Sequence, residues 1–158
     1  FWDTAEMKQY ARMFVEELVP YVDDHYQTLR TPEGRANLGQ GFAGCVALYT
    51  TLNYPGRFGY LASQSSVFWA LEREQIITEL IAEVAVQDLE IYLEWGKYDL
   101  QRHDMDVKGI GDRNRNFYQQ LTRAGYALTG GQINAGFGWS SWKHQLDEIL
   151  VRFYPFAE

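Results

Sequence analysis

Apolar residues recur along the chain with two spacings, one helical and the other typical of short strands. The helical spacing predicts helices over these ranges: Ala5–Tyr26, Phe42–Asn53, Trp69–Val86, Asp112–Gly125 and Ser141–Tyr154. Short apolar or alternating runs predict strands between them: Arg35–Leu38, Phe58–Gln64, Asp88–Trp95 and Tyr126–Asn134. Strand and helix therefore alternate along the chain, which is typical of an α/β fold with a parallel sheet.

Proline and glycine interrupt this pattern at several points. Pro20 is expected to kink or interrupt the first helix because proline has no backbone N–H. Thr31–Gly34 is predicted to be a turn, and Gly130–Gly131 to interrupt the last strand. Gly96–Gly111 is a polar segment long enough to be a functional or disordered loop. The chain contains no internal repeat or linker, so it is treated as belonging to one domain.

The segment from Arg35 to Tyr49 joins a short strand to an apolar helix through a cluster of glycines, Gly39, Gly41 and Gly44. This is the layout of a nucleophile elbow, in which Gly-x-Ser-x-Gly turns a strand sharply into a helix. Small residues are needed because the turn is strained and the backbones pass close together. The central position is Gly41 and not serine. The sequence therefore predicts the turn of a nucleophile site without its nucleophile.

Composition narrows the classes of protein that fit. The chain has 158 residues, of which 46% are hydrophobic and 16% aromatic, so we expect a core and a cleft rich in rings. A net charge of −7 argues against nucleic acid or an anionic membrane surface as a partner. No apolar stretch is long enough to span a membrane. No phosphate loop, dinucleotide motif or zinc motif is present, so no cofactor or metal is predicted. The single cysteine, Cys45, leaves the compartment open.

Three motifs appear in an order that resembles the α/β-hydrolase esterase family of enterochelin esterases and esterase D-like proteins. Where the family tends to carry Gly-x-Ser-x-Gly-Gly, Tyr-Pro-x-Arg-Phe-Gly and a serine-rich strand end, this chain has Gly39–Gly44, Tyr54–Gly59 and Ser63–Ser66. The likeness runs from about Glu16 to Pro155. It implies the C-terminal portion of a larger domain, whose N-terminal half would supply a neighbouring strand and an oxyanion-hole donor. The start at Phe1, without methionine, fits a piece of a longer or processed protein.

The resemblance also implies a serine, an acid and a histidine, in that chain order. The serine position is Gly41. The acid position matches Asp99, with Asp104 or Asp106 as alternatives. Phe137 occupies the histidine position, before the last helix. Two of the three groups are thus replaced by groups that cannot exchange a proton, and no intact catalytic triad is predicted.

Other side chains could replace the lost groups, but each has a simpler explanation. The serines fit strand-end hydrogen bonding, the cysteine fits burial in a helix, and the histidines fit surface positions. These candidates are Ser63, Ser65, Ser66, Cys45, His25, His103 and His144. A metal site at His103, Asp104 and Asp106 is not predicted, because a further ligand cluster at fixed spacing is lacking.

A ligand cleft is expected where residues at the strand ends form the rim of the active-site crevice. The candidates are Gln40, Phe42, Ser65, Trp69, Trp139 and Trp142. Ordinary core packing is the alternative explanation for the aromatic residues.

These observations predict an α/β-hydrolase-like parallel sheet flanked by helices, with residues 1–158 forming the C-terminal portion of one domain. The predicted function is binding or structural, in an inactive, degenerate esterase-like domain. One alternative is an active carboxylic-ester hydrolase that uses an unmatched serine. Another is a scaffold or oligomerisation module of a larger envelope or extracellular protein. Expected partners are the missing N-terminal half, a small-molecule ligand and a second copy of the chain, without nucleic acid or membrane insertion.

Overall fold

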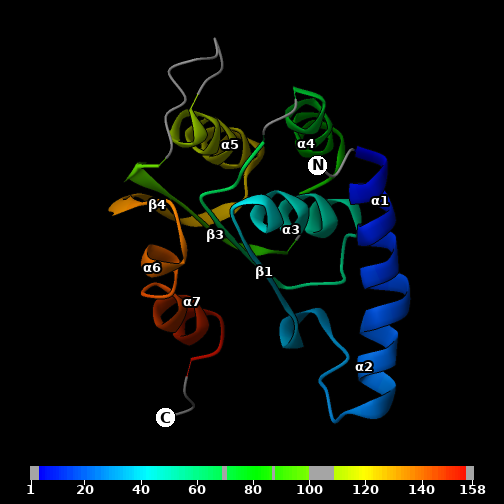
Figure 1. Ribbon diagram of the computed structural model, residues 1–158. Helices are drawn as coiled ribbons and strands as arrows, with labels where there is room; N and C mark the ends of the chain where they lie inside the picture. The colour runs from blue at the N-terminus through cyan, green and yellow to red at the C-terminus, as the bar shows by residue number, and fades with distance from the viewer. Residues whose placement is uncertain (1–3, 69–70, 87, 100–108, 156–158) are drawn as a thin grey trace.

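A parallel sheet of four strands, in the order β1-β2-β3-β4, forms the centre of the protein. The computed structural model describes residues 4–68, 71–86, 88–99 and 109–155. The strands are β1 (Ala36–Gln40), β2 (Tyr60–Gln64), β3 (Glu90–Tyr98) and β4 (Ala127–Gly136). The predicted α/β architecture with a parallel sheet is therefore confirmed (Figure 1).

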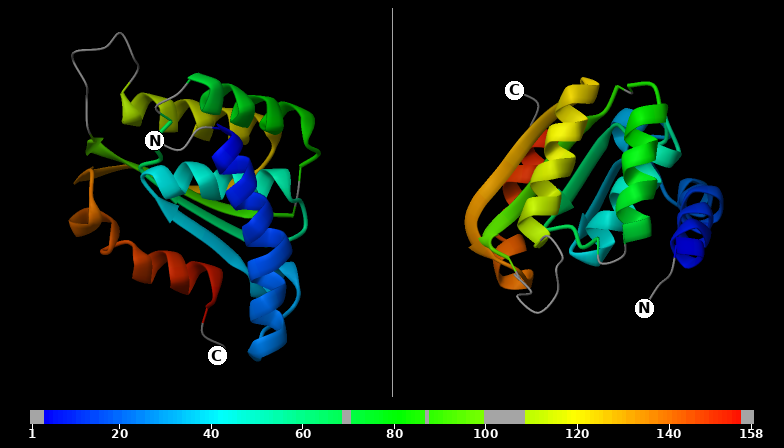
Figure 2. Two further views of the ribbon diagram at one scale, coloured as in Figure 1. Left: turned by 45° about the vertical axis from the view of Figure 1, so that its right-hand side comes forward. Right: turned by 90° about the horizontal axis from the view of Figure 1, so that it is seen from above.

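Helices cover both faces of the sheet. The crossover helices pack on one face, because successive right-handed connections in one direction along a sheet keep their helices on the same side. They are α3 (Phe42–Asn53), α4 (Leu71–Glu83) and α5 (Ile110–Ala124). The opposite face carries α6 (Trp139–Trp142) and α7 (Leu146–Phe153), as Figure 2 shows. A short 3₁₀ turn, Pro32–Gly34, precedes β1 at the predicted turn.

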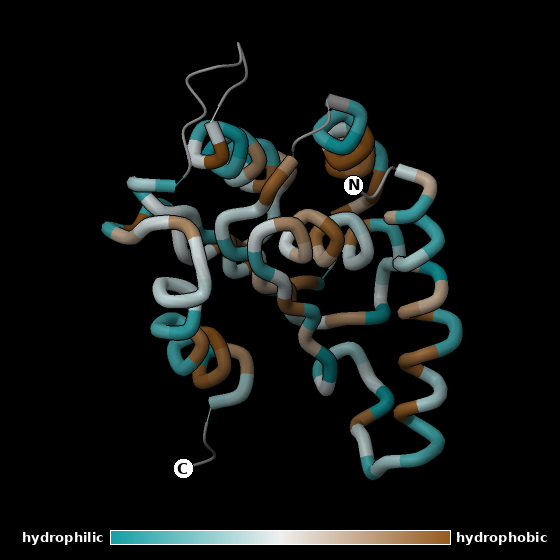
Figure 3. The backbone as a smooth tube through the Cα atoms, in the orientation of Figure 1, coloured by the Kyte–Doolittle hydropathy of each residue, from teal (hydrophilic) through white to brown (hydrophobic). Residues whose placement is uncertain are grey.

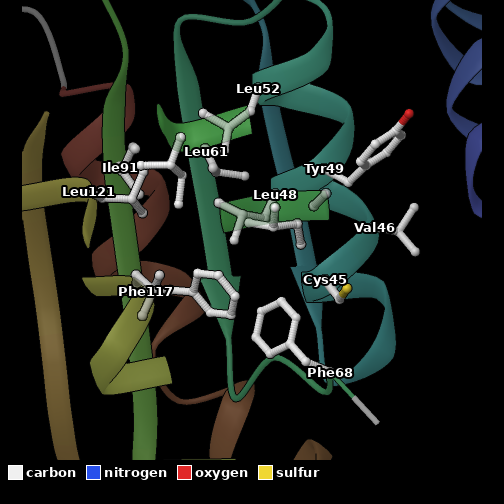
Figure 4. Packing of buried hydrophobic residues seen from close by; sticks show 14 of the residues in the cluster. Cys45, Val46, Leu48, Tyr49, Leu52, Leu61, Phe68, Ile91, Phe117 and Leu121 are labelled. Carbon is white, nitrogen blue, oxygen red and sulfur yellow. The ribbon is translucent and has the colours of Figure 1, made fainter. Parts of the chain in front are cut away.

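The core lies between β1–β3 and the crossover helices. Helix α3 is apolar almost all round, and each of its residues from 44 to 52 is buried. Leu48 and Leu52 of α3 contact a cluster that includes Leu61 of β2 and Phe117 of α5 (Figure 4). This burial explains why the apolar run predicted the bounds of α3 correctly.

The first predicted helix is divided into three parts: α1 (Thr4–Met13), a π-helical turn (Phe14–Leu18) and α2 (Val19–His25). In the π turn, the Val19 N–H bonds to the Phe14 carbonyl five residues earlier. Pro20 follows directly and has no N–H for an α-helical bond, so the α-helical pattern is interrupted where the proline predicted it. Apolar and polar residues alternate along this helix in Figure 3, which fits an element with one buried side.

Two expectations about the later strands are corrected. The last strand is not interrupted at Gly130–Gly131, because both glycines pair with β3, opposite Leu93 and Glu94. Their φ angles of 91° and 107° are left-handed, and a Cβ on Gly130 would lie 2.5 Å from the Leu93 carbonyl oxygen. Glycine thus lets β4 pass close to β3 where a side chain would prevent it.

The polar loop predicted over Gly96–Gly111 is also shorter than expected. Strand β3 continues to Tyr98 and α5 begins at Ile110. Residues 91–96 are all buried, so the apolar-polar alternation that indicated the strand does not separate a buried from an exposed face. Buried parallel strands are enclosed by helices on both sides, which explains this burial.

Candidate functional site

The chain turns from β1 into α3 at one residue, Gly41. Its φ of 57° and ψ of −121° form a left-handed conformation that favours glycine. The Gly41 N–H donates to the Gln64 carbonyl oxygen at 2.8 Å, and the Gly41 carbonyl oxygen accepts from the Val67 N–H at 3.0 Å. Both bonds attach the turn to the end of β2 and the segment after it.

The flanking glycines allow strand and helix to approach each other. A Cβ on Gly39 would lie 2.1 Å from the Ala43 carbonyl oxygen, and one on Gly44 would lie 2.4 Å from the Ser66 Oγ. Both distances are shorter than real Cβ contacts allow. The glycine spacing in the sequence therefore reflects backbone packing on both sides of the turn.

Two aromatic rings lie over the turn. A Cβ on Gly41 would be 3.2 Å from both Phe137 Cζ and Trp142 Cη2. The two rings pack edge to face, with centroids 4.8 Å apart. The position of an elbow side chain thus faces the residue matched to the family's histidine. The tertiary structure brings Gly41 and Phe137 together across almost a hundred residues of sequence.

Helix α6 is attached to the end of β2 through Trp142. The Trp142 Nε1–H donates to Ser65 Oγ at 3.2 Å, and its carbonyl oxygen accepts from Gln64 Nε2 at 3.2 Å. Ser65 is buried and has a positive φ of 47°, a conformation that costs energy for a residue with a side chain. These contacts hold the aromatic pair over the elbow.

Asp99 is a buried carboxyl group at the end of β3, with 4% of its surface exposed. Its Oδ2 accepts from the Gly96 N–H at 2.8 Å, while Oδ1 has no hydrogen-bond partner among the described residues. Burial raises the pKa of Asp99, and the Ser65 hydroxyl and the Gly96 amide offset part of that rise. Asp99 therefore lies close to the Ser65–Trp142 contact.

A row of polar side chains crosses three strands, where Gln40 at the end of β1, Gln64 at the end of β2 and Glu94 within β3 occupy aligned register positions. Gln40 Nε2 donates to Gln64 Oε1 at 3.0 Å, and Gln64 Nε2 donates to Glu94 Oε1 at 2.6 Å. Tyr92 Oη donates to Glu94 Oε2 at 2.6 Å. Glu94 is fully buried, and burial raises its pKa against the lowering effect of the Tyr92 and Gln64 hydrogen bonds.

Glu94 was missed at the sequence level. Its signal was an acidic residue at the carboxyl end of a strand that is otherwise mostly apolar. The alternating pattern suggested an ordinary exposed position, because one strand viewed alone does not show that helices cover both of its faces.

Several other candidate residues have structural roles. Ser63 and Ser66 hydrogen-bond to each other, and the Ser66 backbone bonds the Asn114 side chain. Burial raises the pKa of the Cys45 thiol to about 12, so the thiol is protonated at neutral pH. Trp139 is 59% exposed, whereas Phe137 and Trp142 are half-buried.

The remaining candidates divide into two groups. His25 and His144 are exposed, as expected. Trp69, His103, Asp104 and Asp106 lie outside the described residues.

Across the described ranges, no group of three or more His, Cys, Asp or Glu residues is placed to hold a metal ion. None of the described helices has the length and apolar character needed to cross a bilayer.

Comparison with known proteins agrees with this geometry. Among curated proteins, the uncharacterized protein YjcH of Bacillus subtilis is 25% identical over 150 residues, which are 94% of this chain and 61% of that protein. The iron(III) enterobactin esterase of Escherichia coli K12 is 28% identical over 157 residues, covering 96% of this chain and 35% of that enzyme. The chain thus spans less than two thirds of the length of these relatives.

Solved structures agree on the fold. The enterochelin esterase of Shigella flexneri has a TM-score of 0.75 and 25% identity, over 97% of this chain and 40% of that one. An S-formylglutathione hydrolase of Staphylococcus aureus has a TM-score of 0.64 at 16% identity, over 93% of this chain and 65% of that one, and shows the shared fold alone. The sequence profile of the family described as "Putative esterase" matches residues 3–153. This chain, with an α/β-hydrolase-type fold, therefore belongs to the Putative esterase family.

Proposed function

We propose that this chain belongs to a catalytically inactive, esterase-like domain that binds a small-molecule ligand. The observation that carries the proposal is the contact between the Gly41 elbow and the Phe137 ring. Nucleophilic acyl transfer needs a side chain that attacks and a base that takes its proton. Glycine offers neither group at the turn, and a phenyl ring cannot accept a proton.

The surroundings of the elbow support a binding role. The half-buried rings of Phe137 and Trp142 offer aromatic contact surface, and the half-buried Gln40 offers a polar group at the end of β1. Ligand sites in proteins commonly combine an apolar lining with a few placed polar groups. The enterobactin esterase of Shigella flexneri was solved in the presence of 2,3-dihydroxy-N-benzoylserine. For this chain, we propose a ligand of similar aromatic character.

The test is fluorophosphonate labelling of the intact protein, with an active enterobactin esterase as the positive control. We expect no labelled serine. A labelled serine would contradict the proposal and favour the alternative of an active carboxylic-ester hydrolase. The described serine to inspect first is Ser65, because its hydroxyl lies beside the buried Asp99 carboxyl group.

Binding and scaffold roles are separated by a second measurement. If the cleft binds ligands, 2,3-dihydroxy-N-benzoylserine should raise the Tm of the intact protein in a concentration-dependent way. An unchanged Tm at saturating concentrations would favour the scaffold or oligomerisation alternative.

We also propose that residues 1–158 are the C-terminal portion of one α/β-hydrolase domain. The share of the relatives that the chain covers, 61% and 35%, supports this. The position of β1 at one edge of the described sheet supports it too, since a preceding segment could pair there.

A further inference from the structure

Arg73 is a buried cation on the first turn of α4. Only 6% of its surface is exposed, and its guanidinium carbon lies 4.7 Å from the centre of the Phe42 ring. Its Nε is enclosed without a hydrogen-bond partner. No carboxylate of the described residues forms an ion pair with it. Among the described residues, the interaction that accompanies this buried charge is with the aromatic ring of Phe42.

A second buried arginine shows what is unusual about Arg73. Arg113 of α5 is 4% exposed, but its Nε lies 3.6 Å from Glu74 Oε2. Buried charges in proteins are generally paired, because removing a charge from water is costly without a partner. The Nε atoms of both arginines lack a hydrogen bond in the described structure, but Arg73 also lacks, among these residues, the ion pair that Arg113 makes. An uncompensated buried charge of this kind is typical of functional sites.

The electrostatic surroundings of Arg73 favour an anion. Phe42, the ring beneath the guanidinium, is the first residue of α3, whose N-terminus has no capping side chain. The N-terminal end of a helix carries a partial positive charge. Cys45 is the titratable neighbour of Arg73, and its raised pKa keeps the thiol neutral. Two sources of positive potential, the Arg73 guanidinium and the N-terminal end of α3, therefore meet at Phe42, the residue after the elbow.

The orientation of the guanidinium narrows the class of anion. The guanidinium carbon of Arg73 lies over the Phe42 ring, which leaves the N–H donors of the group for a ligand. The edge of a guanidinium presents parallel N–H donors that match the two oxygens of a carboxylate. Helix α4 lies against α3 on the same face of the sheet (Figure 1), and Phe42, the ring beneath the guanidinium, directly follows Gly41 in the chain.

We propose that Arg73, together with the N-terminal turn of α3, forms a subsite for the carboxylate group of a ligand. This inference rests on the binding role proposed above and specifies its chemistry. The aromatic pair Phe137–Trp142 would contact the apolar part of the ligand on the other side of the elbow.

The first test compares the binding of benzoate and its neutral analogue benzamide to the intact protein, measured by ligand-observed NMR. We expect the parent to bind benzoate about tenfold more tightly, because a charge-assisted hydrogen bond is lost with benzamide. Arg73→Met should bind both probes with similar affinity, and Arg73→Lys should retain part of the preference. Equal affinities in the parent, no benzoate binding, or an unchanged preference in Arg73→Met would each overturn the proposal.

The second test needs no ligand. Arg73→Met keeps an apolar side chain on Phe42 but removes the unpaired charge, so we expect Tm to rise by about 2–4 °C. The matched control, Arg113→Met, leaves Glu74 without its partner and should lower Tm. A lower Tm for Arg73→Met would show that the cation is a structural anchor and would overturn the subsite. If benzoate binds but 2,3-dihydroxy-N-benzoylserine leaves Tm unchanged, only the aromatic ligand proposed above is contradicted.

Discussion

Residue 41 combines a backbone requirement with a packing requirement. Its left-handed conformation favours glycine whatever surrounds it, and the rings of Phe137 and Trp142 leave little space above it. The same turn carries the nucleophile in active relatives of this fold class, where a side chain tolerates the strain. Glycine at this position therefore relieves the strain and has no side chain that could act as a nucleophile.

Gly41→Ser should destabilise the intact protein modestly. The strained conformation costs a side chain about 1–3 kcal/mol, and the new Cβ would press on two rings. The measurement is Tm, with Gly56→Ser as the matched control. Gly56 has a similar φ of 74°, but a Cβ there would meet nothing within 4 Å. Gly41→Ser should therefore lower Tm more than Gly56→Ser. A Tm equal to or above the parent's would argue against an elbow at Gly41.

Restoring one lost group should give almost no hydrolysis, because a serine without a base stays a protonated alcohol. Restoring both, as Gly41→Ser with Phe137→His, would place hydroxyl and imidazole at positions that face each other. The buried carboxyl group of Asp99 would be available to orient the ring. The double variant should hydrolyse p-nitrophenyl acetate faster than the parent, with a strongly non-additive gain.

Initial rates across the parent, both single variants and the double variant check this prediction. Circular dichroism should first show that each variant is folded. If the folded double variant is no faster than the parent, the site has lost more than these two groups, or Phe137 does not correspond to the histidine.

At the scale of elements, the ends of β1, β2 and β3 are joined by side chains as well as by backbone. The Gln40–Gln64–Glu94 row ties three strands together, and Gln64 also holds α6 through the Trp142 carbonyl oxygen. The raised pKa of Glu94 in this network makes the stability of the fold depend on pH. Because the native state holds the proton of Glu94 more strongly than the unfolded state does, protonation favours folding.

The stabilising contribution of Glu94 should be complete below its ordinary pKa of 4.5 and lost as pH rises through its higher native value. Glu94→Gln should remove this slope, since a neutral amide keeps the size and hydrogen-bonding capacity of the acid. The measurement is the difference in free energy of unfolding between parent and variant, followed from pH 4 upward by urea denaturation. The free energy of unfolding of Glu94→Gln should rise relative to that of the parent as pH rises.

Asp23→Asn serves as a control of opposite sign. A hydrogen bond from Thr28 and the charges of Arg35 and Arg30 hold the pKa of Asp23 below its ordinary value. Its stabilising contribution is therefore lost on acidification. The free energy of unfolding of Asp23→Asn should fall relative to that of the parent as pH rises. A pH-independent difference between the parent and Glu94→Gln would contradict the role assigned to Glu94.

At the scale of the whole molecule, β1 forms one edge of the described sheet. A cavity of about 300 Å³ lies beside it, lined by apolar residues that include Tyr10, Phe42 and Val46. A second, of about 430 Å³, lies between α2 and the C-terminal segment and includes Leu29 and Phe58. An uncovered strand edge with apolar surroundings favours aggregation.

We therefore predict that residues 1–158 expressed alone are insoluble or molten, and that they fold when a preceding segment supplies a strand for β1. Solubility, near-ultraviolet circular dichroism and calorimetry of both forms check this expectation. A cooperative thermal transition from the isolated, monomeric 158-residue chain would contradict it.

The sequence by itself determined the order of the strands and crossover helices, the bounds of α3, the turn at Gly41 and the interruption before Pro20, whereas the single helix expected over Ser141–Tyr154 is divided into α6 and α7. These features depend on neighbours a few residues apart, so periodicity, glycine spacing and proline carry them. The resemblance to esterases singled out Asp99 and Phe137, whose match to the acid and histidine positions stays a prediction.

Only the tertiary structure decided the features that join distant segments. Gly130 and Gly131 read locally as a break, yet the approach of β3 keeps them in the strand. Glu94 and Arg73 read as ordinary polar residues until neighbouring elements enclose them. The contact of Gly41 with Phe137 depends on how β4 and α6 return to the elbow. Burial and charge pairing belong to the packed molecule, and a local pattern of residues does not contain them.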